Sequence, residues 1–106
     1  MNWIDTAAEQ DVADGEALAV SLQGIPVVLV RDGEKIFALH DQCTHGVARL
    51  SDGFVENGCI ECPLHQGRFD LATGEPRCPP VKRAVKTYQV RRLGGRVEVG
   101  LTSVSE

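Results

Sequence analysis

The sequence predicts a small all-β protein, an antiparallel sandwich or partly open barrel with a loop-rich, metal-binding subdomain inserted into it. Three observations support this fold class. The 106-residue length suits one domain and leaves little room for a second. Both ends of the chain carry β-branched, alternating segments separated by two-residue turn signals. All four cysteines lie in the middle, between residues 41 and 80, where regular apolar patterning is weak.

The elements follow from these patterns in chain order. Turn signals are expected at 23–24, at 32–33 as a type I′ turn, at 57–58 and at 94–95. Residues 7–12 suit a single helical turn, and nothing longer is predicted to be helical. The segments predicted to be strands are 3–4, 17–22, 26–30, 35–40, both arms of a hairpin over 54–61, 87–93 and 96–101.

The charge balance excludes some functions. Fifteen acidic residues against eleven basic ones give a net charge of −4, which argues against binding to nucleic acid or to an anionic membrane surface. Eleven of the acids lie in residues 1–66, a distribution that suits either solubility or steering of a basic partner. The longest apolar run, residues 25–30, is too short to cross a bilayer, and no targeting segment is visible. A cytoplasmic protein with reduced thiols is therefore expected.

The middle of the chain differs from the rest. Outside the hairpin over 54–61 it has little apolar pattern, so we expect that apolar burial alone cannot hold it together and that a metal organises it. The chain is accordingly predicted to be one domain, 1–106, with a metal-binding subdomain at about 41–82 and a β base formed by 1–40 and 83–106.

Two short motifs supply the metal ligands. Each places a thiol and an imidazole on one tight loop: Cys43 with His45, and Cys62 with His65. Two thiolates and two imidazoles suit zinc or a Rieske-type [2Fe-2S] cluster. Zinc fingers group cysteine with cysteine and histidine with histidine, whereas each loop here has one of each. The pattern favours the cluster, with both cysteines on one iron and both histidines on the other.

The two motifs and their flanks resemble a known family. Cys-Thr-His-Gly, followed by Cys-Pro-Leu-His-Gln-Gly, is similar to the Rieske signature, and the stretches 41–53 and 60–70 resemble the ferredoxin components of bacterial aromatic-ring-hydroxylating dioxygenases, the naphthalene dioxygenase type especially. Thr73-Gly74 and the run 78–81 fit the same family, in which a proline-containing loop covers the cluster.

The resemblance implies a function. It implies a monomeric electron carrier, not an enzyme, with one Rieske [2Fe-2S] cluster held by Cys43, His45, Cys62 and His65. The carrier would pass single electrons from an NAD(P)H-dependent flavoprotein reductase to a terminal Rieske oxygenase. The implied docking face is the cluster tip, which includes Val47, Leu64, Gln66 and Pro80 as well as the two histidines.

Departures from high-potential respiratory Rieske proteins suggest a low potential. Those proteins carry an additional cysteine in each cluster loop, and the matching positions here are Ala48 and Leu64. Phe69 also stands where they have a tyrosine. Fewer hydrogen bonds to sulfur imply a reduction potential at the lower end of the Rieske range, about −150 mV.

Two other interpretations remain open from the sequence. A Rieske-like subunit of an assimilatory reductase would share the fold. A structural zinc-binding module could use Cys59, Cys62, Cys43 and Cys78, although only one Cys-x-x-Cys pair is present. We expect Cys59 and Cys78 to be inert thiols, and His40 to be a surface histidine.

Overall fold

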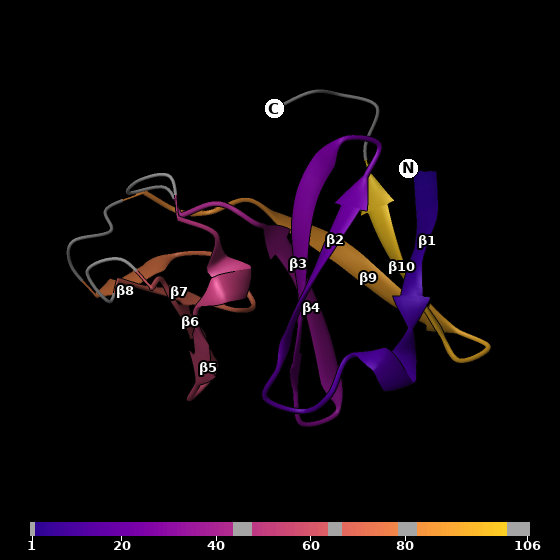
Figure 1. The fold of residues 1–106 in the computed structure, drawn as a ribbon, viewed down its shortest axis with the longest axis horizontal. Coiled ribbons are helices and arrows are strands. Elements are labelled where there is room, and N and C mark those ends of the chain that lie inside the picture. Colours follow the sequence, from indigo (N-terminus) through magenta and orange to yellow (C-terminus); the bar gives the residue numbers. More distant parts are fainter. Residues whose placement is uncertain (1, 44–47, 64–66, 79–82, 102–106) are drawn as a thin grey trace.

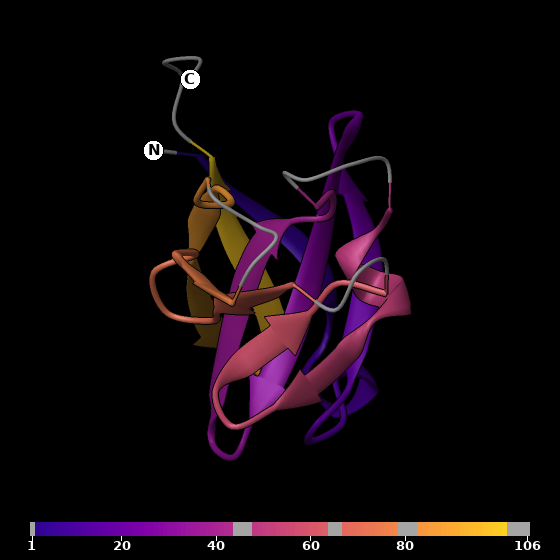
Figure 2. The same ribbon diagram turned by 90° about the vertical axis from the view of Figure 1, so that its left-hand side faces the viewer.

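A computed structural model describes residues 2–43, 48–63, 67–78 and 83–101, and for Cys78 only its backbone. These residues form two antiparallel sheets and two short 3₁₀ turns, as expected for the all-β class (Figures 1 and 2). In the described part of the chain, no helix has both the length and the apolar character that crossing a membrane requires. The elements are β1 (Asn2–Ala8), η1 (Glu9–Asp11), β2 (Ala17–Leu22), β3 (Ile25–Asp32), β4 (Lys35–His40), η2 (Leu50–Asp52), β5 (Phe54–Glu56), β6 (Cys59–Glu61), β7 (Arg68–Asp70), β8 (Pro76–Cys78), β9 (Thr87–Leu93) and β10 (Arg96–Leu101).

The larger sheet has six strands in the order β1-β10-β9-β4-β3-β2 and joins the two ends of the chain. It curls around an apolar core made by alternate residues of its strands. The buried members of this core are Val12, Leu22, Val27, Leu29, Ile36, Ala38, Val97, Val99 and Leu101. The predicted strands 17–22, 35–40, 87–93 and 96–101 are confirmed with these bounds.

The smaller sheet has four short strands in the order β5-β6-β7-β8, all between residues 54 and 78. Figure 2 shows it in front of the larger sheet, next to β3 and β4. The Asn57-Gly58 hairpin is confirmed, with both turn residues at positive φ as a type I′ turn requires. Strands β7 and β8 were not predicted from the sequence, because three residues are too few to show an alternating pattern.

The middle of the chain has an apolar core that its sequence pattern did not indicate, while the expected role of a metal in organising it stays a prediction. Side chains from the smaller sheet and its loops form a second core against the back of β3 and β4. Strand β3 supplies both cores, because Val27 and Leu29 face one while Val28 and Val30 face the other. The buried members of the second core are Val28, Val30, Leu39, Cys43, Leu50, Ile60, Cys62, Phe69, Leu71 and Val85.

Three details in the N-terminal half also differ from prediction. Strand β1 runs over seven residues instead of two, because it pairs along the whole of β10 and is held there by backbone bonds. The turn between β3 and β4 is centred on Gly33-Glu34 instead of on residues 32–33, since Asp32 still pairs with Lys35. Only Gly33 has a positive φ there, which fits a type II′ turn. The predicted helical turn is a three-residue 3₁₀ turn, η1.

The segment just before β9 is bonded through its backbone to both sheets. The His40 amide donates to the Lys86 carbonyl at 2.8 Å, and the Val85 amide donates to the Gly74 carbonyl at 2.8 Å. Gly74 has a φ of +78°, and a Cβ there would lie 2.1 Å from the Val85 carbonyl oxygen. Only glycine therefore permits the turn after β7 to approach the chain that returns to the base.

Candidate metal centre

The first predicted ligand loop leaves strand β4 and is closed by hydrogen bonds at its base. The Cys43 amide donates to the Ala48 carbonyl at 2.9 Å, which brings the two ends of the loop together. Just outside this bond, the Asp41 carboxylate accepts hydrogen bonds from the Ser51 amide at 2.7 Å and from the Ser51 hydroxyl at 2.6 Å. The Asp41 amide donates to the Pro26 carbonyl at 3.0 Å, so the loop is also tied to the start of β3.

The second predicted ligand loop connects β6 to β7 and is closed in the same way. The Cys62 amide donates to the Gly67 carbonyl at 2.7 Å. Immediately outside it, Glu61 and Arg68 are paired across the two strands, and the Arg68 Nε atom lies 3.1 Å from the Glu61 carboxylate. Each loop is therefore fixed by a backbone bond from its cysteine and by an adjacent carboxylate.

Both cysteines lie in the second core. Cys43 is 2% exposed and Cys62 is fully buried, and they share this core with Leu50 and Ile60. Thiolates in such an apolar setting are costly unless a metal binds them. Two buried thiols, each at the base of a closed loop, therefore fit a group that takes one thiolate from each loop.

The other predicted ligands and docking residues lie outside the described residues. These are His45, Val47, Leu64, His65, Gln66 and Pro80. Among the described residues that border the two loops, Gln42, Arg49 and Pro63 are exposed to solvent, whereas Ala48 is half-buried and Gly67 is buried. The buried thiols thus lie just beneath a solvent-exposed part of the surface.

Cys59 is separated from the two core cysteines by the geometry of its strand. Side chains alternate along β6, so Ile60 enters the core while Cys59 and Glu61 lie half-buried on the opposite face. Cys62 follows at the core side, and the two thiols of the Cys-x-x-Cys pair point to opposite faces of the sheet. Among the residues with described side chains, no three His, Cys, Asp or Glu groups gather as a metal site. Cys43, Cys59 and Cys62 therefore do not form the cysteine-rich zinc site considered above.

The outer face of the smaller sheet is occupied by charged groups. The Arg77 guanidinium donates a hydrogen bond to the Asp70 carboxylate at 2.9 Å. This bond is the main reason that the pKa of Asp70 lies below its usual value. The same bond raises the pKa of Arg77, with a smaller contribution from Cys59. Asp70 also accepts hydrogen bonds from the amides of Ala72 and Thr73, which fixes the turn between β7 and β8.

Sequence reasoning missed the groups that anchor the loops. Asp41 and Ser51 were visible only as flanks of the first motif, and nothing in the sequence indicated that they bond to each other. Asp41 is nevertheless the one buried charged side chain in the described part of the chain. An acid two residues before a predicted ligand is the only signal that could have suggested it.

The fold and the two closed cysteine loops define a small β protein built to hold a metal group at one end. A family model for the Rieske [2Fe-2S] domain matches residues 2–89, and the chain belongs to this family. It therefore carries a Rieske-type [2Fe-2S] cluster, a one-electron group that two thiolates and two imidazoles hold.

Two relatives are similar over nearly the whole chain. The ferredoxin component of the naphthalene 1,2-dioxygenase system of Pseudomonas aeruginosa is 46% identical over 94% of this chain and 96% of its own length. The ferredoxin subunit of anthranilate 1,2-dioxygenase from Burkholderia cepacia is 43% identical over 93% of this chain and 92% of its own length.

Solved structures give the same result for the fold. The ferredoxin of carbazole 1,9a-dioxygenase from Nocardioides aromaticivorans IC177 matches with a TM-score of 0.92 at 33% identity, over 96% of this chain and all of that one. A chain in a complex of reduced oxygenase and oxidized ferredoxin in carbazole 1,9a-dioxygenase matches with a TM-score of 0.87 at 35% identity, over 92% of this chain and 91% of that one. A putative nitrite reductase small subunit has a TM-score of 0.84 at 20% identity over 95% of this chain and all of that one, which shows the fold alone.

Proposed function

We propose that this chain is the ferredoxin of an aromatic-ring dioxygenase system. It carries one electron at a time from an NAD(P)H-dependent flavoprotein reductase to a terminal Rieske oxygenase. The observation that carries this proposal is the 46% identity to a naphthalene dioxygenase ferredoxin over nearly the full length of both chains. On this proposal the chain is an electron carrier in the cytoplasm, and the oxygenation takes place on its partner.

The ligands we propose are Cys43 and Cys62 for one iron and His45 and His65 for the other. The described part of the site supports the two cysteines, because both thiols are buried in one core at the base of closed loops. The histidines follow each cysteine within the same loops. The chain is proposed to be one Rieske domain, in which about 41–82 bind the cluster and 1–40 and 83–106 form the base.

The proposed docking surface is the tip of the two loops, with Val47, Leu64, Gln66 and Pro80 around the two histidines. The exposure of Gln42, Arg49 and Pro63, which border the loops, is consistent with a partner approaching from this end. A small apolar surface suits the short-lived encounters of redox partners. The partnership of a ferredoxin with an oxygenase in the carbazole complex is a precedent for this proposal.

A purified protein tests the proposed cluster directly. We expect a red-brown protein with two irons and two sulfides per chain and a Rieske electron paramagnetic resonance (EPR) signal after reduction. Replacing either cysteine or either histidine of the set should abolish or change this signal, whereas Cys59→Ser should leave it intact. A colourless protein with one bound zinc would refute the proposal.

The electron-transfer role needs a second test with partners. The protein should restore turnover of a naphthalene dioxygenase whose own ferredoxin has been omitted. Leu64→Asp should slow electron transfer to the oxygenase while the EPR signal stays unchanged. A Leu64→Asp protein that retains its signal and the full transfer rate would show that the loop tip is not the docking surface.

A further inference from the structure

The first ligand loop is anchored by a buried carboxylate that has no ion-pair partner among the residues that the structure describes. Asp41 is 2% exposed, and it accepts hydrogen bonds from the amide and the hydroxyl of Ser51 at 2.7 and 2.6 Å. Both donors belong to a neutral residue. In the described part of the chain, no arginine or lysine forms an ion pair with Asp41. Such a buried charge is costly, which suggests that it serves the site.

The second ligand loop provides a contrast within the same molecule. Glu61 stands directly before Cys62, and Asp41 stands two residues before Cys43. The Glu61 carboxylate is paired with Arg68, whose Nε atom lies 3.1 Å away and whose guanidinium also lies 3.8 Å from the Glu56 carboxylate. Each loop therefore has a carboxylate close to its cysteine in the sequence, and within the described residues only the carboxylate at the second loop has an ion-pair partner.

We propose that Asp41 lowers the reduction potential of this protein, and that the two hydrogen bonds from Ser51 partly offset the charge of its carboxylate. Asp41 precedes Cys43 by two residues, so their Cα atoms are within about 7 Å of each other. Water screens a charge at this depth only weakly. Because reduction adds a negative charge to the site, a fixed negative charge beside it disfavours the reduced state. The inference rests on the proposed function, since it takes Cys43 to be a ligand.

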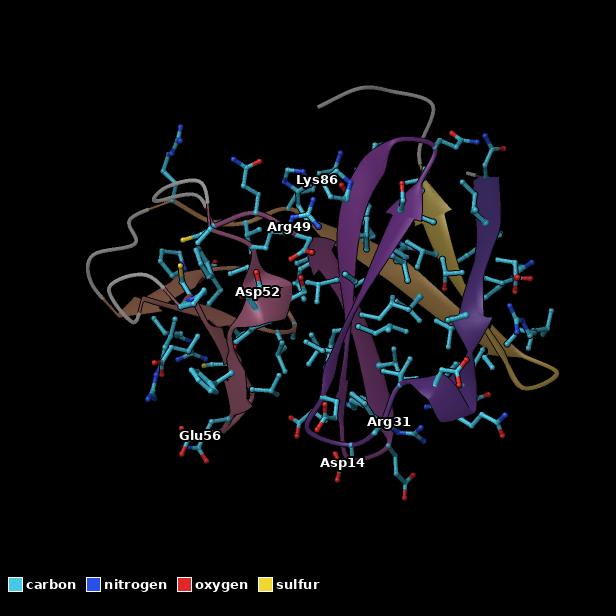
Figure 3. The ribbon with its side chains drawn as sticks, viewed as in Figure 1. Asp14, Arg31, Arg49, Asp52, Glu56 and Lys86 are labelled. Atoms are coloured by element: carbon cyan, nitrogen blue, oxygen red, sulfur yellow. The ribbon has the colours of Figure 1, made fainter. Side chains whose placement is uncertain are left out.

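The experiment compares three variants by the midpoint potential and the EPR spectrum of the purified protein. Asp41→Asn removes the charge but keeps a side chain of the same shape that can still bond to Ser51. The matched control is Asp52→Asn, which removes the same charge from an exposed position on η2 (Figure 3). Ser51→Ala keeps the charge of Asp41 and removes one of its two hydrogen-bonded partners.

We expect Asp41→Asn to make reduction about tenfold more favourable, an upward shift of about 59 mV for one electron. Asp52→Asn should shift the potential by less than a third of this amount, because water screens its charge. Ser51→Ala should lower the potential, because the carboxylate loses a hydrogen bond that offsets its charge. The positions of the EPR signals should stay the same in all three, which a displaced loop would not allow.

The proposal is overturned if Asp41→Asn shifts the potential no more than Asp52→Asn does. It is also overturned if Asp41→Asn and Ser51→Ala shift the potential in the same direction, because that result would mean that the pair only shapes the loop. If the Asp41→Asn protein does not retain iron, the test rests on the Ser51→Ala protein. A midpoint potential of Ser51→Ala that equals or exceeds that of the wild type then refutes the inference. A wild-type protein without a Rieske signal would refute the proposed function itself, which is a separate outcome.

Discussion

A methyl group at Gly53 should separate the two ligand loops. Gly53 follows η2, which holds the exit of the first loop, and it packs against the end of β6, which leads into Cys62. A Cβ atom at this position would lie 1.8 Å from the Glu61 carbonyl oxygen, whereas real Cβ contacts are at least 3.0 Å. The Gly53→Ala substitution must therefore move two backbone segments apart by about 1.2 Å, the difference of those two distances.

The cost can be estimated from this overlap. Overpacking typically destabilises a protein by about 1–3 kcal/mol, and the upper end applies here because the opposing atoms belong to the backbone and cannot rotate away. A loss of about 3 kcal/mol is large against a total stability of about 5–15 kcal/mol. At about 4–8 °C per kcal/mol, the melting temperature should fall by about 12–24 °C. Because the loops on both sides move, the iron content should fall as well.

The assay measures melting temperature and iron per chain for Gly53→Ala beside a matched control, Gly95→Ala. Gly95 lies in the turn after β9 with a φ of +79°, and nothing lies within 4 Å of its added Cβ. The control should lose about 1–2 kcal/mol from its left-handed backbone and keep all of its iron. If Gly53→Ala retains full iron and melts within a few degrees of the wild type, the close contact between η2 and β6 does not hold the loops together.

Three further substitutions have expected outcomes. Phe69→Ala removes a fully buried ring from the second core and should reduce the free energy of unfolding by about 3–5 kcal/mol in urea titrations; a loss below 1 kcal/mol would mean that this core does not support the fold. The pKa of Asp70 is lowered, so this carboxylate adds stability above its ordinary pKa and loses that contribution as the pH falls through the lowered value. Asp70→Asn should therefore flatten the fall of melting temperature below about pH 4, and an unchanged slope would contradict it. Cys43→Ser should abolish the Rieske signal that Cys59→Ser leaves intact, and equal effects of the two would refute the ligand assignment.

The hairpins of the fold could be predicted from sequence because their signals are local. Two-residue turns such as Asn57-Gly58 and Gly94-Gly95 need positive φ at both positions, and few residue pairs provide it. The strands beside Gly94-Gly95 are also long enough to show an alternating pattern. The error at Gly33 arose from the same rule, because Asp32-Gly33 has the composition of a type I′ turn while the pairing of Asp32 with Lys35 places the turn one residue later.

The anchoring of the ligand loops could not be predicted in this way. The hydrogen bonds from Ser51 to Asp41 join residues that are ten positions apart, and only the folded chain brings them together. The close contact at Gly53 depends on the carbonyl of Glu61, a backbone atom that every residue type would supply. The cysteine and histidine spacing was predictable because the chemistry of the metal restricts residue type, whereas anchoring of the loop backbone does not.

The run of apolar residues in β3 explains how the site is attached to the base. A strand that covers one core alternates, but Val27, Val28, Leu29 and Val30 are all fully buried. Alternate residues serve the base core and the core that contains Cys43 and Cys62. The two cores therefore share a strand, and any movement of the thiols against the base would disturb packing on both sides of β3. An electron carrier needs this rigidity, because a group held in one geometry changes little between its two charge states.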